Sequence, residues 1–118
     1  MDRETRMKKS TKTVIYAIQH EIKSNPLKDK KISLIARDAG INRKLLEAGF
    51  KLLFEVTIKQ YQLMHKLEYS QQLLDTGRLT IKEIAFKCGY SSQNNYAKAF
   101  KKLYGQTPTH WQNRHEAA

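Results

Sequence analysis

A short polar set near the start of a predicted helix over residues 92–103 has the chemistry needed to contact nucleic-acid bases. Gln93, Asn94, Ala97 and Lys98 recur at the i, i+1, i+4 and i+5 spacing that places side chains on one face of a helix. Gln and Asn hydrogen-bond adenine bidentately, Lys reaches guanine, and the Ala methyl group contacts thymine. The alternative is a solvated helix face rich in amides. We predict base contact for the set.

A second set occupies the matching positions of a predicted helix over Arg43–Phe54. Arg43 and Lys44 either read guanine or hold phosphate, and Ala48 completes the set. Glu47 either accepts a hydrogen bond from cytosine N4 or pairs within the helix with Arg43 or Lys51, four residues away on either side. Both interpretations of Glu47 stay open at this point.

Phosphate contacts fix the register of a protein on a duplex without reading its sequence. Helix N-termini favour anions because their amide donors are unsatisfied within the helix. The candidates for phosphate contact lie at predicted helix starts or on the same face further along: Thr80, Lys82, Ser91, Ser92 and Lys101. For each lysine the alternative is an ordinary soluble surface charge.

These side chains are positioned by a unit that occurs twice in the chain. Ile35-Ala36-x3-Gly40-Ile41 recurs 49 residues later as Ile84-Ala85-x3-Gly89-Tyr90. Beyond that turn the offset is 50, and the matched positions are Leu46 with Tyr96, Phe50-Lys51 with Phe100-Lys101, Thr57 with Thr107, and Tyr61 with Trp111. The repeat predicts one helix-turn-helix unit used twice, with one extra residue in the second turn. We expect Phe50, Tyr61, Phe100 and Trp111 to be core residues.

No segment shows sustained period-two alternation, so the predicted fold is all-α, with about seven helices in two helix-turn-helix subdomains bridged by a long central helix. The predicted plan is a flexible basic arm at 1–12, a first subdomain at 13–56, a linker helix at 57–76 and a second subdomain at 77–114. Scaffold helices are expected at Ile32–Ala39 and Ile81–Cys88, and a final short helix after Pro108. Asn42 and Ser91 are the expected N-caps of the two predicted base-contacting helices, Arg43–Phe54 and 92–103, which we call the recognition helices.

The two copies differ at positions that affect local stability. The second copy has a Thr80-x-x-Glu83 capping box, and the first has Lys31 and Leu34 there. The first copy also places Glu55 where the second has Gly105, and Gly49 where the second has Ala99. We therefore expect the first subdomain to be the softer one.

Composition narrows the class of protein. Lys and Arg outnumber Asp and Glu by 22 to 11, giving a net charge of +11, which favours a polyanionic partner. The lone Cys88, matched to Ala39, is expected to be a small buried residue in a cytoplasmic protein. The four histidines have no metal-ligand spacing with it, and no catalytic constellation is discernible, so we expect neither an enzyme nor a cofactor. The apolar stretch at residues 14–18 is too short for a membrane span.

The second copy also carries a family resemblance. From Ile84 to Trp111 the pattern Ile-Ala-x3-Gly-Tyr-Ser-Ser-Gln-x2-Tyr-x3-Phe-Lys-Lys-x2-Gly-x-Thr-Pro-x2-Trp resembles the AraC/XylS family of bacterial transcriptional regulators. The resemblance implies sequence-specific binding of double-stranded DNA, with two recognition helices in successive major grooves. Because one chain carries both, we expect direct and asymmetric half-sites. RNA polymerase is a further candidate partner, and no membrane or small-molecule ligand is expected. The alternative function is a non-specific nucleoid-type or RNA-binding protein.

Overall fold

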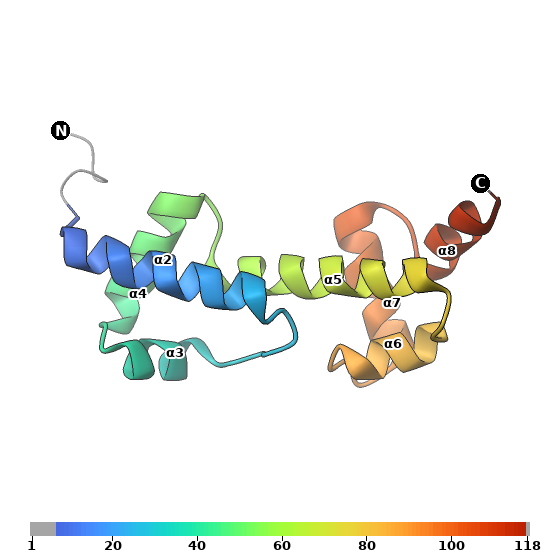
Figure 1. The fold of residues 1–118 in the computed structure, drawn as a ribbon, viewed down its shortest axis with the longest axis horizontal. Helices are drawn as coiled ribbons and strands as arrows, with labels where there is room; N and C mark the ends of the chain where they lie inside the picture. Colours follow the sequence, from blue (N-terminus) through green and yellow to red (C-terminus); the bar gives the residue numbers. More distant parts are fainter. Residues whose placement is uncertain (1–6, 118) are drawn as a thin grey trace. The chain divides into compact units, whose positions relative to one another are not determined.

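The computed structural model describes residues 7–117 and their side chains as far as residue 113. This part of the chain is entirely helical apart from its turns, so the predicted all-α class is confirmed there (Figure 1). Its seven helices are α2 (Lys9–Ser24), α3 (Ile32–Ala39), α4 (Arg43–Phe54), α5 (Ile58–Thr76), α6 (Ile81–Lys87), α7 (Gln93–Tyr104) and α8 (Pro108–Ala117).

The chain divides into two compact units, one up to Leu63 and one from Met64 onward. The division falls inside α5, so each unit takes part of that helix. The sequence predicted a linker helix at 57–76, and α5 spans nearly the same residues. Ile58 at its start belongs to the core of unit 1, and Leu67, Ser70 and Leu74 belong to the core of unit 2. A capping box begins α5, because Thr57 Oγ1 accepts from the Gln60 amide at 3.1 Å while Gln60 Oε1 accepts from the Thr57 amide at 2.9 Å.

The core of unit 1 forms where α2 covers α3 and α4. The buried residues on α2 recur at helical spacing and pack with those of the next helices: Ile15, Ile18, Ile22, Ile35, Ala36, Leu46, Phe50 and Ile58. The helix α2 begins at Lys9, so the predicted flexible arm at 1–12 is wrong over its last four residues. Met7 packs against the core cluster and anchors this end, which the polar sequence gave no means to predict. The first six residues of the predicted arm lie outside the described residues.

Gly49 on α4 lies close against Ile15 of α2. A Cβ atom there would lie 2.5 Å from Ile15 Cδ1 and 3.2 Å from Met7 Cε. The sequence indicated that this glycine weakens α4, and the structure adds that its missing side chain is what admits Ile15. The intrinsic helical penalty of Gly is therefore offset by packing that only Gly permits.

Unit 2 has its own core, formed by α5, α6, α7 and the start of α8. Its buried residues are Leu67, Ser70, Leu74, Ile84, Ala85, Cys88, Tyr96, Phe100 and Pro108. The Tyr96 hydroxyl donates to Ser70 Oγ at 2.8 Å, and Ser70 donates in turn to the Leu67 carbonyl at 2.6 Å. This chain of bonds satisfies two polar groups in an apolar core. Burial raises the pKa of the Tyr96 hydroxyl, and the hydrogen bond with Ser70 acts in the opposite direction.

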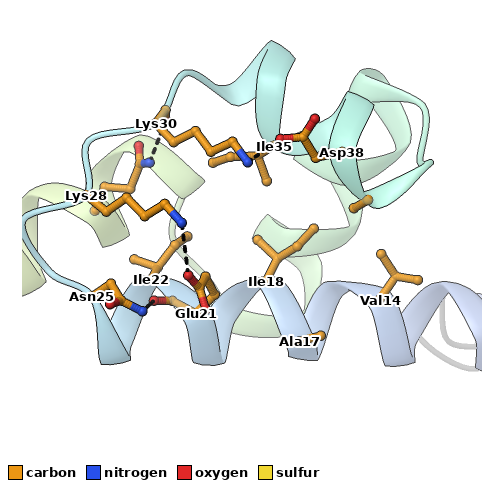
Figure 2. Close-up of a pocket in the computed structure, with 12 residues that line it drawn as sticks. Val14, Ala17, Ile18, Glu21, Ile22, Asn25, Lys28, Lys30, Ile35 and Asp38 are labelled. Carbon is orange, nitrogen blue, oxygen red and sulfur yellow. Dashed lines mark hydrogen bonds and ion pairs between the residues drawn. The ribbon is translucent and has the colours of Figure 1, made fainter.

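Cys88 is buried as expected, and burial raises the pKa of its thiol. Ala39, its counterpart in unit 1, is exposed because it lines an open groove of 440 Å³ between α2 and α3. Figure 2 shows the apolar floor of this groove, with Lys28 reaching Glu21 at 3.4 Å and Lys30 reaching Asp38. Nothing in the sequence predicted this groove.

Candidate nucleic-acid interface

The helix α4 starts as the sequence predicts. Gly40 adopts the left-handed conformation, with φ of 67°, that ends α3, and its amide bonds back to the carbonyls of Ala36 and Arg37. Two residues later Asn42 caps α4 by accepting from the Leu45 amide at 3.2 Å. This turn therefore fixes the residue at which α4 begins, and with it the positions of Arg43 and the residues that follow.

The corresponding turn in unit 2 differs by its extra residue. Ser92, not Ser91, is the N-cap of α7, since its hydroxyl accepts from the Asn95 amide at 3.1 Å. The prediction of Ser91 as the cap was wrong, and so was the helix start at Ser92. Ser91 Oγ instead accepts from Asn95 Nδ2 at 2.8 Å. The offset of 50 that holds after the turn pairs Ser92 with Asn42, and this signal was present in the sequence.

On α7 the predicted base-reading residues share an outward face. Gln93, Asn94 and Lys98 are exposed, and Ala97 is half-buried between them. Within the described residues, none of the three polar side chains is used in a hydrogen bond or ion pair of the unit itself. The opposite face is anchored by Tyr96 and Phe100, both fully buried. The helix thus presents two amides and an amine to a ligand while its other side is held in the core.

On α4 the matching face is differently equipped. Arg43, Lys44, Glu47 and Ala48 are all exposed. Arg43 Nε donates to Glu47 Oε1 at 2.7 Å, so of the alternatives left open, the helix pairs Glu47 with Arg43 and not with Lys51. Leu45, the next residue after Lys44, is an exposed large apolar side chain, and the sequence analysis did not predict that it would be exposed.

The scaffold helices carry the remaining candidates. Thr80 and Glu83 form the predicted capping box, with Thr80 Oγ1 accepting from the Glu83 amide and Glu83 Oε1 accepting from the Thr80 amide, each at 3.1 Å. The bond from the Thr80 backbone lowers the pKa of the Glu83 carboxyl. Lys82 and Lys101 are exposed. By contrast, Lys31, the N-cap residue of α3, makes no side-chain capping bond among the described residues.

The aromatic residues predicted as core occupy equivalent places in the two units. Phe50 and Phe100 are fully buried, whereas Tyr61 and Trp111 are half-buried and pack edge-on against them, with ring centroids 5.4 and 6.2 Å apart. Each of the outer rings also uses its polar atom. Gln19 donates to the Tyr61 hydroxyl at 2.7 Å, and Trp111 Nε1 donates to Asp75 at 3.1 Å. These rings therefore brace the units and are not stacking platforms for bases.

Other kinds of site find no support in the described part of the chain. No group of three or more His, Cys, Asp or Glu side chains within it is arranged to hold a metal ion. None of its helices combines the length and apolar character that a membrane crossing requires.

Comparison with known proteins gives consistent matches. A family model described as a helix-turn-helix domain matches residues 35–114. The chain is 33% identical over 106 residues to the Xylose operon regulatory protein of Escherichia coli K12, covering 90% of this chain and 27% of that protein. It is 34% identical over 85 residues to the Probable transcriptional regulator LumQ of Photobacterium leiognathi, covering 70% of this chain and 34% of that protein. The chain thus matches only 27% and 34% of the length of these two curated relatives.

Solved structures share the fold. The structure of the xylose-binding transcription activator xylR superposes with a TM-score of 0.69 at 33% identity, over 80% of this chain and 25% of that one. The DNA-binding domain of AdpA, solved in complex with a target DNA, gives a TM-score of 0.79 at 18% identity over 87% of this chain and 93% of that one. At that lower identity the likeness concerns the fold alone.

Proposed function

The chain belongs to the AraC/XylS family of helix-turn-helix domains, and on that premise we propose that it binds double-stranded DNA sequence-specifically to regulate transcription. The observation that carries the proposal is the outward face of α7. Gln93, Asn94 and Lys98 are exposed there and make no hydrogen bond or ion pair with the described residues, on a helix whose other side is held by Tyr96 and Phe100. Polar groups held in a fixed orientation and left unsatisfied are what direct base readout needs.

In this proposal α7 lies in a major groove with its N-terminal half against the base edges. Gln93 and Asn94 make bidentate bonds to adenine, Lys98 reaches guanine, and the Ala97 methyl contacts a thymine methyl group. Asn95 takes no part, because its side-chain amide is bound to Ser91.

In the proposal α4 is the second helix that contacts bases, and other residues contact the DNA phosphates. Arg43 contacts a guanine, and Lys44 contacts either a guanine or a phosphate. Thr80, Lys82, Ser91, Ser92 and Lys101 contact phosphates. The Thr80 and Ser92 oxygens already accept from backbone amides, so each offers its hydroxyl proton to a phosphate oxygen. These contacts add affinity without selecting a sequence.

We further propose that α4 and α7 occupy successive major grooves, so that the target contains two direct, asymmetric half-sites about 10 base pairs apart. The relatives named as transcriptional regulators support a DNA-binding role over an enzymatic one. The proposal places the chain in the cytoplasm and includes RNA polymerase as a further partner.

Binding to a duplex selected from a random library, measured against a scrambled duplex of equal composition at several salt concentrations, tests the proposal. We expect the selected duplex to bind at least 100-fold more tightly, and both affinities to fall with salt because lysines release counterions (roughly −0.9 in log–log slope per phosphate neutralised). Equal affinity for both duplexes would indicate non-specific binding, and preference for RNA would indicate an RNA-binding protein.

A variant pair assigns the specificity to α7. Gln93→Ala combined with Asn94→Ala should reduce discrimination by at least roughly 30-fold, since two bidentate pairs at about 1–3 kcal/mol each together contribute at least about 2 kcal/mol. Gln72→Ala is the matched control, because Gln72 is an exposed amide on α5 outside the proposed reading face. An unchanged preference in the double variant would contradict the role given to α7.

A further inference from the structure

We propose that Glu47 is a positioning residue, which holds Arg43 by its Nε edge so that the two Nη groups read a guanine in the first half-site. The inference rests on the proposed DNA binding and extends it to the way α4 obtains its specificity. It assigns to Glu47 a role different from reading cytosine directly, which was one of the alternatives left open by the sequence.

The geometry of the pair carries the inference. Arg43 Nε donates to Glu47 Oε1 at 2.7 Å, one helical turn away on the same face of α4. A guanidinium has five N–H donors, one on Nε and four on the two Nη atoms. Only the Nε donor is used among the described residues, so the outer edge with both Nη groups is free. Two such donors match the O6 and N7 acceptors of guanine.

The ion pair also affects whether Arg43 contacts a base or a phosphate. The Arg43 side chain is 58% exposed and, without a partner, would sample many rotamers and reach phosphates as easily as a base. The ion pair with Glu47 restricts the rotamers of Arg43. It also lowers the net positive charge at this position, and so weakens its attraction for phosphates. Neighbouring Lys44 makes no ion pair within the described residues and stays available for the backbone.

The Arg43–Glu47 pair of α4 has no counterpart in α7. Aligned from their N-caps, Ser92 and Asn42, Gln93 takes the place of Arg43 and Ala97 takes the place of Glu47. The shorter, neutral Gln93 has fewer torsions to restrain, and α7 has no carboxylate one turn later. The acidic residue therefore occurs in the helix whose first reader is a long cation.

Removal of the carboxylate should shift Arg43 from base reading toward phosphate binding. In Glu47→Ala we expect affinity for scrambled duplex to rise and guanine discrimination at one base pair to fall about 10-fold. Glu47→Gln keeps an oxygen acceptor for Arg43 Nε but removes the charge. It should therefore raise affinity for scrambled duplex similarly while keeping most of the guanine preference, which separates positioning from charge.

The experiment measures dissociation constants for the wild-type chain and the variants on the selected duplex and on duplexes with every single base-pair substitution in the first half-site. Arg43→Ala identifies the base pair that Arg43 reads, and Glu68→Gln on α5 is the control for loss of one negative charge away from α4. Glu47 is exposed and Ala is a strong helix former, so the variants should fold, and circular dichroism checks this.

The inference predicts that Glu47→Ala and Arg43→Ala lose preference at the same base pair and that Glu47→Gln largely rescues it. Loss at two different base pairs would show that Glu47 reads a base itself and would overturn the inference, as would an unchanged guanine preference in Glu47→Ala. A wild-type chain without any base preference would instead overturn the proposed function, and this inference with it.

Discussion

The close approach of α2 to α4 at Gly49 makes Gly49→Ala a sensitive test of how unit 1 is held together. The new methyl group would lie 2.5 Å from Ile15 Cδ1, so the fully buried Ile15 side chain must shift within the core to admit it. Overpacking of this kind costs about 1–3 kcal/mol. Ala in a helix interior is better than Gly by ~1 kcal/mol. We therefore expect a net loss of about 1 kcal/mol in the free energy of unfolding.

A double variant tests the cause of that loss. Ile15→Val removes Cδ1, the atom that blocks the new methyl group, and by itself should cost about 1 kcal/mol. Combined with Gly49→Ala it leaves space for the Cβ atom, so the helix-propensity gain offsets the lost methylene and the pair should return near wild-type stability. The two substitutions thus have a predicted coupling energy of about 2 kcal/mol.

Urea unfolding followed by far-ultraviolet circular dichroism measures these free energies, while the fluorescence of Trp111, the single tryptophan, reports on unit 2. Ala99→Gly, at the matching position of α7, provides the propensity term in a helix without this contact. A stabilised Gly49→Ala variant, or strictly additive effects of the two substitutions, would refute the packing argument.

The other predictions concern single contacts. Glu55 has φ of 64°, where Gly105 stands in the other unit, so Glu55→Gly should stabilise the chain by ~1 kcal/mol in thermal unfolding, and no gain would contradict the assigned strain. Ser70→Ala leaves the buried Tyr96 hydroxyl without its acceptor and should cost about 1–3 kcal/mol, most of it recovered when Tyr96→Phe is added; equal losses in the single and double variants would refute this. The pKa of the Glu83 carboxyl is lowered in the folded chain, so its charge stabilises the fold above the ordinary pKa of 4.5, and this stabilisation is lost as the pH falls through the pKa of the folded state. Glu83→Gln and the wild type should therefore converge in stability in acid. A difference in stability that does not change with pH would contradict the capping role.

Much of the local structure follows from turn chemistry and could be predicted. Gly40 and Asn42 fix the bounds of α3 and α4 because a left-handed residue and a side-chain cap act within a few residues of chain. The start of α7 was missed because Ser91 and Ser92 are both good caps, although the offset of 50 that pairs Ser92 with the cap Asn42 favours Ser92.

What the sequence did not predict depends on contacts between distant residues. The extension of α2 to Lys9 depends on Met7 reaching the core, and the role of Gly49 depends on which side chain faces it. The partner of Glu47 is a related case, since spacing permits Arg43 and Lys51 equally and only the side-chain conformations decide between them.

In the proposed function, one chain carries two helices that read DNA. Selection of bound duplexes from a random library, by the chain as it stands, tests this most directly. We expect two short enriched sequences, unlike each other and about one helical turn apart, with Gln93→Ala and Asn94→Ala altering one and Arg43→Ala altering the other. Selection that enriches no sequence, or a single short sequence altered by both sets of variants, would contradict it.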